Sequence, residues 1–140
     1  MRGRFFLDTN VFVYLFDSNY PKKLAAAEEL VERALKSRQG VVSYQVVQEF
    51  FSVAFRKFSA QMSFAEAQQY LTTMFRPLLA VESSPGLFSE ALIIGDKYRL
   101  SWYDSVILAA AIEGECEVLY SEDFQDGQKF GELVVRNPFK

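Results

Sequence analysis

Short apolar segments alternate with longer segments of helical periodicity along almost the whole chain. Strands that alternate with helices favour a parallel sheet with helices on both faces, and the strands of such a sheet are nearly continuous apolar runs. The sequence therefore predicts an α/β fold. The expected strands are residues 4–7, 40–43, 78–81, 117–120 and 133–135, and the expected helices are residues 9–16, 21–39, 44–58, 63–76, 84–98 and 104–112.

Local signals indicate where several of these helices begin and end. Pro21 suits the first position of a helix, and Gly40 follows the last apolar position, so we expect Gly40 to end that helix. Ser63 and Glu66 have the spacing of a capping box, and Pro85 again suits a first helical position. The segment VILAAAI, residues 106–112, is apolar on every side, which predicts a central helix.

Composition limits the classes of protein to consider. A chain of 140 residues that is 50% hydrophobic can bury about two-thirds of its unfolded surface, so one domain over residues 1–140 is expected. The single cysteine, Cys116, allows no intrachain disulfide, and neither a leader nor a long uncharged apolar span is evident. These features predict a cytoplasmic protein with no membrane contact. The net charge of −3 provides no strong basic field for nucleic acid.

The chain contains no histidine. This absence removes the commonest general base, the commonest metal ligand and every nucleophile that a histidine activates. The glycine-rich phosphate loops of nucleotide-binding proteins are also missing. Catalysis by this chain would therefore have to rest on carboxylates, most simply together with a hard cation.

One carboxylate interrupts an apolar segment. Asp8 lies between FFL and, after Thr9 and Asn10, VFV. An ionised carboxylate is costly to bury unless it is paired, hydrogen-bonded or bound to a metal. Asp8 could simply cap the helix that follows, which is the ordinary structural reason for an aspartate at this place. Its position at the carboxyl end of a predicted strand also suits a functional site.

Other acids are expected near the same edge of the sheet. Asp104 lies in the first turn of the apolar helix, on the face that also carries Ile107, where the helix dipole would favour it. Glu49 lies at the border of an apolar helix face, where a solvated glutamate is the commoner interpretation. Asp123 and Asp126 belong to the loop SEDFQDGQ, which follows a predicted strand and could be an ordinary polar turn.

The combined placement of these acids is more informative than any one of them. Several carboxylates at one edge repel each other unless cations neutralise them, and oxygen ligands without histidine select Mg²⁺ or Mn²⁺. Such ions suit phosphodiester chemistry, because they can activate a water and stabilise the leaving oxygen.

Four segments of the chain resemble the motifs of a known family. In order, FLDTNVFVYLFD, SYQVVQEF, SWYDSVILAAA and LYSEDFQDGQ are similar to the four acidic motifs of the PIN-domain family, and most of all to those of its VapC-type toxins. The resemblance extends from about Phe5 to Phe139. It implies a three-layer α/β/α sandwich with a central parallel sheet. It also implies an endoribonuclease that uses Mg²⁺ or Mn²⁺ and acts as the toxin of a toxin–antitoxin pair.

The resemblance also implies residue roles. Asp8, Asp104 and Asp123 would hold metal, Glu49 would orient or deprotonate the attacking water, and the products would carry 5′-phosphate and 3′-hydroxyl ends. Asp126 matches a further acid that some members use for metal. Two hydroxyl residues match the small residues beside the first and last acids, namely Thr9 and Ser121.

Partners follow from the resemblance and from the aromatic content. The 14 phenylalanines favour exposed association surfaces, so a homodimer and a small antitoxin are expected. The groove for the antitoxin would lie between residues 44–58 and 63–75. Arg99 and Trp102 are candidate contacts to RNA, since arginine and aromatic rings stack on unpaired bases; core packing is the other interpretation of Trp102.

Two other functions fit parts of the same pattern. A phosphatase of the haloacid-dehalogenase type also begins with an aspartate after its first strand, used as a nucleophile, and Asp8 would take that role. That family has a second aspartate two residues later, where this chain has Asn10. A noncatalytic binding module with the PIN fold is the other alternative, and the intact acids argue against it.

Overall fold

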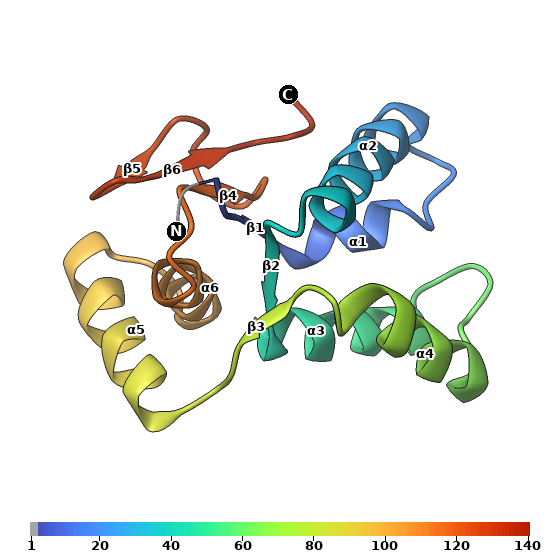
Figure 1. The fold of residues 1–140 in the computed structure, drawn as a ribbon, viewed down its shortest axis with the longest axis horizontal. Helices are drawn as coiled ribbons and strands as arrows, with labels where there is room; N and C mark the ends of the chain where they lie inside the picture. Colours follow the sequence, from blue (N-terminus) through green and yellow to red (C-terminus); the bar gives the residue numbers. More distant parts are fainter. Residues whose placement is uncertain (1–2) are drawn as a thin grey trace.

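The computed structural model describes residues 3–140, which form a sheet with helices on both faces (Figure 1). The strands are β1 (Phe5–Leu7), β2 (Gly40–Ser43), β3 (Leu79–Val81), β4 (Val118–Tyr120), β5 (Lys129–Phe130) and β6 (Leu133–Arg136). The helices are α1 (Thr9–Tyr14), α2 (Pro21–Ser37), α3 (Tyr44–Arg56), α4 (Phe64–Tyr70), the π-helical turn η1 (Leu71–Phe75), α5 (Pro85–Tyr98) and α6 (Trp102–Glu113). In this part of the chain no helix is both long and apolar enough to cross a membrane.

The sheet has the strand order β3-β2-β1-β4-β6-β5. All neighbouring strands are parallel except β5, which pairs with β6 in the antiparallel sense. The prediction of an α/β fold with a parallel sheet is therefore confirmed for the five longer strands. Strand β5 was missed because it has only two residues and follows a polar loop. It turns into β6 at Gly131, whose φ of 64° suits glycine.

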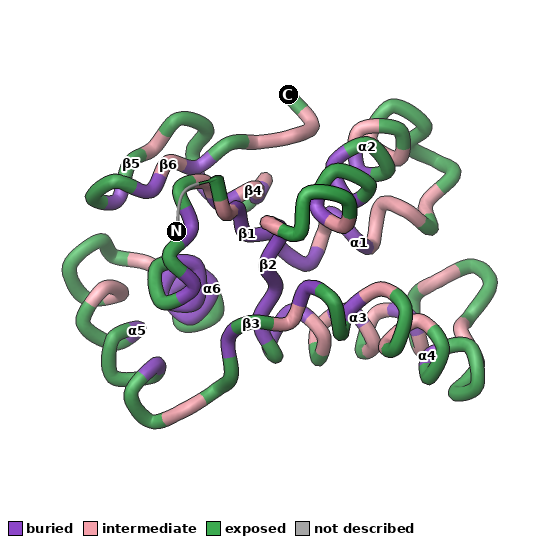
Figure 2. The backbone as a smooth tube through the Cα atoms, viewed as in Figure 1, coloured by how far each residue is buried: buried purple, intermediate pink, exposed green. Residues whose placement is uncertain are grey.

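Helices α5 and α6 lie on one face of the sheet, and α1 to α4 lie on the other (Figure 1). The prediction that α6 is central is confirmed, because its residues from Ser105 to Ala111 are all buried (Figure 2). On the opposite face the core is aromatic and contains three fully buried rings, those of Phe12, Phe50 and Phe75. The expected three-layer sandwich is therefore present.

The prediction that Gly40 ends α2 is wrong. The helix ends at Ser37, and the left-handed residue that follows it is Arg38, with φ of 60°. Gly40 instead begins β2, where a Cβ atom would collide with Ala34 of α2. The glycine is thus needed for close packing of helix on strand and not for a helix cap.

The signals at the other helix starts are confirmed. The Ser63 hydroxyl accepts a hydrogen bond from the Glu66 N–H, and the Glu66 carboxylate accepts one from the Ser63 N–H, which completes the capping box. Pro85 is at the start of α5. The π-helical turn between α4 and Pro77 had no signal in the sequence.

Helices α5 and α6 approach closely at one glycine. A Cβ atom on Gly95 would collide with the hydroxyl of Ser105 on α6. This Ser105 hydroxyl donates a hydrogen bond of 2.7 Å to the carbonyl of Ser101, at the start of α6. The contact thus fixes the end of α6 that carries Asp104.

We predict that Gly95→Ala destabilises the protein by up to about 2 kcal/mol, because the overpacking cost of about 1–3 kcal/mol outweighs the gain of about 1 kcal/mol in helix propensity. The matched control is Gly86→Ala in the same helix. The nearest atom to its new Cβ would be 3.8 Å away, so this variant should be neutral or slightly more stable. Denaturant unfolding of both variants measures the difference, and equal stabilities would contradict the packing argument.

Candidate active site

The acids expected from the sequence lie near the carboxyl ends of β1 and β4. These strands are parallel neighbours, with Leu7 paired to Tyr120, so the residues that follow them emerge side by side. The Ser121 hydroxyl donates a hydrogen bond of 2.7 Å to Oδ2 of Asp8. The start of the chain and the loop after β4 therefore meet at one buried carboxylate.

Asp8 is both a helix cap and a buried acid. Its Oδ1 accepts a hydrogen bond of 2.7 Å from the Thr9 N–H at the start of α1. Only 5% of Asp8 is exposed. Burial raises the pKa of Asp8 to about 7; the hydrogen bonds from Ser121 and Thr9 lower the pKa, while the charges of Asp123 and Glu49 raise it. Asp8 therefore caps α1 and is also buried beside other acids, and its role in a functional site stays a prediction.

Glu49 is tied to the same place through Thr9. The Thr9 hydroxyl donates a hydrogen bond of 2.9 Å to Oε1 of Glu49, which lies half-buried on α3. Glu49 is therefore held from α1 and is not a freely solvated surface glutamate. Its charge is close enough to raise the pKa of both Asp8 and Asp123.

Asp104 and Asp123 complete the group. Asp104 is half-buried in the first turn of α6, where its N–H donates to the Ser101 hydroxyl at 3.2 Å. Asp123 follows β4, and its N–H donates to the Ser121 hydroxyl at 3.1 Å. Partial burial raises the pKa of Asp123, and the charges of Asp104, Glu122 and Glu49 raise it further. The four acids named from the sequence therefore interact electrostatically.

Asp126 is set apart from this group. Its Oδ1 accepts a hydrogen bond of 2.8 Å from the N–H of Asn137, which ties the loop to the C-terminal segment. The charges that raise the pKa of Asp8 and Asp123 do not include that of Asp126. Its role as a metal ligand stays a prediction, and the structure gives it a local structural contact.

The candidate RNA contacts lie at the start of α6. Arg99 is exposed and has a left-handed backbone, with φ of 58°. Trp102 is 42% exposed and packs its ring against Phe88 at 5.6 Å, so it does not enter the core. Contact of either residue with RNA stays a prediction.

Sequence reasoning missed a polar network around Glu122. Its Oε1 accepts hydrogen bonds from Tyr14 at 2.7 Å and from Asn10 at 3.3 Å, and its Oε2 forms an ion pair with Lys23 at 3.2 Å. These partners belong to α1 and α2, so the network fixes the backbone immediately before Asp123. Nothing in the spacing of Lys23 and Glu122, 99 residues apart, indicates this contact.

The possible metal-ligand atoms near the carboxyl ends of β1 and β4 are suitable for a hard cation. They are carboxylate and hydroxyl oxygens, with no nitrogen or sulfur ligand. A cation would also relieve the repulsion by which these acids raise the pKa of Asp8 and Asp123. Among residues 3–140, however, no group of three or more acids or cysteines is arranged as a ready metal site. The donor chemistry fits a divalent ion, and the ligand assignment stays a prediction.

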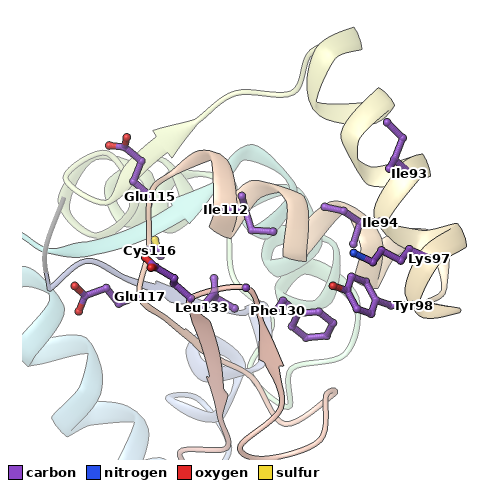
Figure 3. A pocket seen from close by; sticks show the side chains of 12 residues that line it. Ile93, Ile94, Lys97, Tyr98, Ile112, Glu115, Cys116, Glu117, Phe130 and Leu133 are labelled. Carbon is purple, nitrogen blue, oxygen red and sulfur yellow. The ribbon is translucent and has the colours of Figure 1, made fainter.

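A large cavity lies away from the acids. It has a volume of about 770 Å³ and is formed by the C-terminal parts of α5 and α6 and the β5–β6 hairpin (Figure 3). Its apolar walls include Ile112 and Phe130, and Glu115, Glu117 and Glu132 also line it. Glu117 precedes β4 and Asp123 follows it, so the cavity and the acids lie at opposite ends of the strands. The group of acids and this cavity are therefore separate.

Comparison with known proteins identifies the family. The PIN domain profile matches residues 5–126, so the chain belongs to the PIN-domain family. No curated protein sequence matches the chain.

Solved structures share the fold at low sequence identity. A toxin–antitoxin complex from Klebsiella pneumoniae is 20% identical, with a TM-score of 0.65 over 95% of this chain and 96% of that chain. VapBC2 from Rickettsia felis, bound to a promoter DNA fragment, is 18% identical, with a TM-score of 0.63 over 95% and 97%. VapC20 of Mycobacterium tuberculosis, a toxin that cleaves the sarcin–ricin loop, is 18% identical, with a TM-score of 0.60 over 93% and 98%. The fold of this chain is thus that of VapC toxins.

We predict that Asp8→Asn stabilises the metal-free protein at pH 8 and not at pH 4. The folded-state pKa of Asp8, about 7, lies above the ordinary value of 3.8, so the folded state holds the proton more tightly. Protonated Asp8 therefore makes its full contribution to the free energy of unfolding below about pH 4, and this contribution is lost as the pH rises through 7. At about 1.4 kcal/mol per pKa unit, the variant should gain roughly 1–4 kcal/mol at pH 8.

The measurement is chemical unfolding at both pH values in the presence of a chelator. Asp126→Asn is the control, since Asp126 is exposed and its hydrogen bond to Asn137 can be kept by an asparagine. A gain for Asp8→Asn that is the same at pH 4 and pH 8 would show that burial of the charge is not its cause.

Proposed function

We propose that this protein is a metal-dependent endoribonuclease, acting as one nuclease domain and serving as the toxin of a toxin–antitoxin pair in the cytoplasm. The observation that carries the proposal is the electrostatic group of Asp8, Glu49, Asp104 and Asp123 at the carboxyl ends of the parallel strands. These four acids are in the order of the PIN motifs, and PIN nucleases generally use divalent metals.

Each acid has a role that suits its surroundings. Asp8 is rigid, because Thr9 and Ser121 hold its two oxygens, and this favours a fixed cation ligand. Asp104 and Asp123 are less buried and would approach the cation from α6 and from the loop after β4. Glu49, held by the Thr9 hydroxyl, would orient the attacking water and take its proton. The products would carry 5′-phosphate and 3′-hydroxyl ends.

A bound Mg²⁺ or Mn²⁺ would add positive charge among these acids, for water activation and for the developing charge on the phosphate. The Ser121 hydroxyl has a supporting role. It donates to Asp8 and accepts from the Asp123 N–H, so it sets the spacing between two of the proposed ligands.

The proposed antitoxin surface is the aromatic groove between α3 and α4. A cavity of about 400 Å³ is present there and is lined by Phe51, Phe55, Phe64, Ala67, Gln68 and Leu71. Phe64 is 78% exposed, which is unusual for so large an apolar residue. An apolar helix from a partner chain would cover these rings.

The test of the nuclease is cleavage of a mixed RNA pool, with mapping of the cut ends. We expect cleavage with Mn²⁺, none with EDTA, and a loss of about 100-fold or more for Asp104→Asn, the scale on which catalytic carboxylates contribute. Glu132→Gln, an exposed acid at the far cavity, should cleave normally. Well-folded protein that binds Mn²⁺ and RNA but cuts nothing would favour a noncatalytic binding module.

We also predict a homodimer. Three large apolar side chains of α5 and α6 are strongly exposed, namely Leu92 at 62%, Ile93 at 60% and Ile112 at 45%. Burial of such side chains between two copies would be favourable. Sedimentation equilibrium should therefore give about twice the chain mass of 16.0 kDa. A mass of one chain at micromolar concentration would contradict the prediction.

A further inference from the structure

A groove of about 360 Å³ lies directly beside Glu49. It is lined by Gln45, Gln48, Glu49, Ser52, Val53 and Tyr103, which belong to α3 and to the first turn of α6. Its volume lies in the range of about 300–1,000 Å³ typical of sites for small ligands, so it can accept a nucleotide. Because Glu49 belongs to both the groove and the acid group, anything bound in the groove lies next to the acids.

Gln45 forms the inner wall of the groove. Gln45 joins the two helices, since its Nε2 donates to the carbonyl of Tyr103 at 3.3 Å. The residue is only 7% exposed, and its Oε1 has no hydrogen-bond partner among the described residues. Gln45 therefore fixes the inner wall of the groove, because it joins the first turn of α3 to the turn of α6 that carries Tyr103.

The outer edge of the groove is aromatic. Tyr103 is 64% exposed and lines the groove, and Tyr44, the neighbour of Gln45, is 43% exposed. Trp102 is partly covered by Phe88, so Tyr103 offers the freer ring. Exposed tyrosines beside a site are poorly explained by folding, and they are suited to stacking on unpaired bases.

A positive charge is held next to Ser52, one of the residues that line the groove. The Arg56 guanidinium donates from Nε to the Ser52 carbonyl at 3.0 Å and from Nη2 to the Ser52 hydroxyl at 2.8 Å. Arg56 is two turns of α3 beyond Glu49, or about 10 Å along the axis. The side chain is thus held beside a groove residue, where its remaining N–H groups can contact a phosphate.

We propose that this groove is the binding site for the nucleotides next to the bond that is cut in single-stranded RNA. Tyr103 stacks on a base, Gln48 contacts the edge of that base, and Arg56 contacts a neighbouring phosphate, while Gln45 holds α3 and α6 together beneath them. The inference rests on the proposed nuclease function and adds the residues that select the RNA. The net charge of −3 makes placed contacts such as these more important than a general basic surface.

The first experiment measures binding without cleavage. A short single-stranded RNA that carries 2-aminopurine is titrated in Ca²⁺, and quenching of its fluorescence reports stacking. Tyr103→Ala should weaken binding by about 10-fold or more and remove the quenching, since stacking contributes about 1–3 kcal/mol per base, while Tyr103→Phe should preserve both. Arg56→Gln should reduce the slope of log affinity against log salt by about one.

The second experiment measures selection. The cut sites of wild-type protein and of Gln48→Ala are mapped on the same mixed RNA pool, and the variant should show a weaker preference for the bases that flank the cut. Tyr98→Ala is the control for both experiments, because Tyr98 is another partly exposed tyrosine, at 36%, and lines the far cavity. Thermal unfolding of each variant excludes a folding defect as the cause.

The outcomes separate this inference from the proposed function. If wild-type protein cuts RNA but Tyr103→Ala and Arg56→Gln bind and cut as it does, the groove proposal is overturned and the nuclease stands. If wild-type protein binds RNA with quenching that needs Tyr103 but never cuts, the groove stands and the nuclease fails. Absence of any RNA binding overturns both. A change confined to oligomeric mass in Tyr103→Ala would show that the groove is instead a protein interface.

Discussion

The buried carboxylate of Asp8 is the constraint on which the rest of the site depends. Strand β1 is buried on both faces, so the side chain that follows it enters an apolar environment and needs donors. One donor is local, the Thr9 N–H, and the other is the hydroxyl of Ser121, 113 residues away. The second bond ties the loop after β4 to the start of the chain. The positions of Asp123 and Glu49 follow from that bond and from the Thr9 hydroxyl.

Helix starts also stabilise this acidic edge. Asp8 precedes α1 and Asp104 lies in the first turn of α6, so both carboxylates are near the positive end of a helix dipole. The hydrogen bond from Gln45 to Tyr103 joins the first turns of α3 and α6. Close packing at Gly95 holds α6 from its other side. The acids and the neighbouring groove are therefore placed by the same few contacts between helices.

The network of Lys23, Tyr14 and Glu122 also supports the acids at the carboxyl ends of the strands. It brings one cation close to an edge with several negative charges, and it anchors the loop that carries Asp123. The acid edge is a better candidate for phosphate chemistry than the far cavity, because its acids come from several elements and interact electrostatically.

Much of this protein follows from the sequence by itself. Apolar runs and helical spacing determine the alternating elements, and capping residues determine where α4 and α5 begin. Four acidic motifs indicate which acids to consider. Each of these signals depends on residues that are close together in the chain. Strand β5, the left-handed Arg38, the Glu122 network and the groove between α3 and α6 were decided only by the tertiary structure. The Glu122 network and the groove depend on contacts between residues far apart in the chain, and such contacts leave no periodicity or spacing in the sequence. Strand β5 is too short for a strand pattern, and Arg38 is a residue type that does not signal a left-handed conformation.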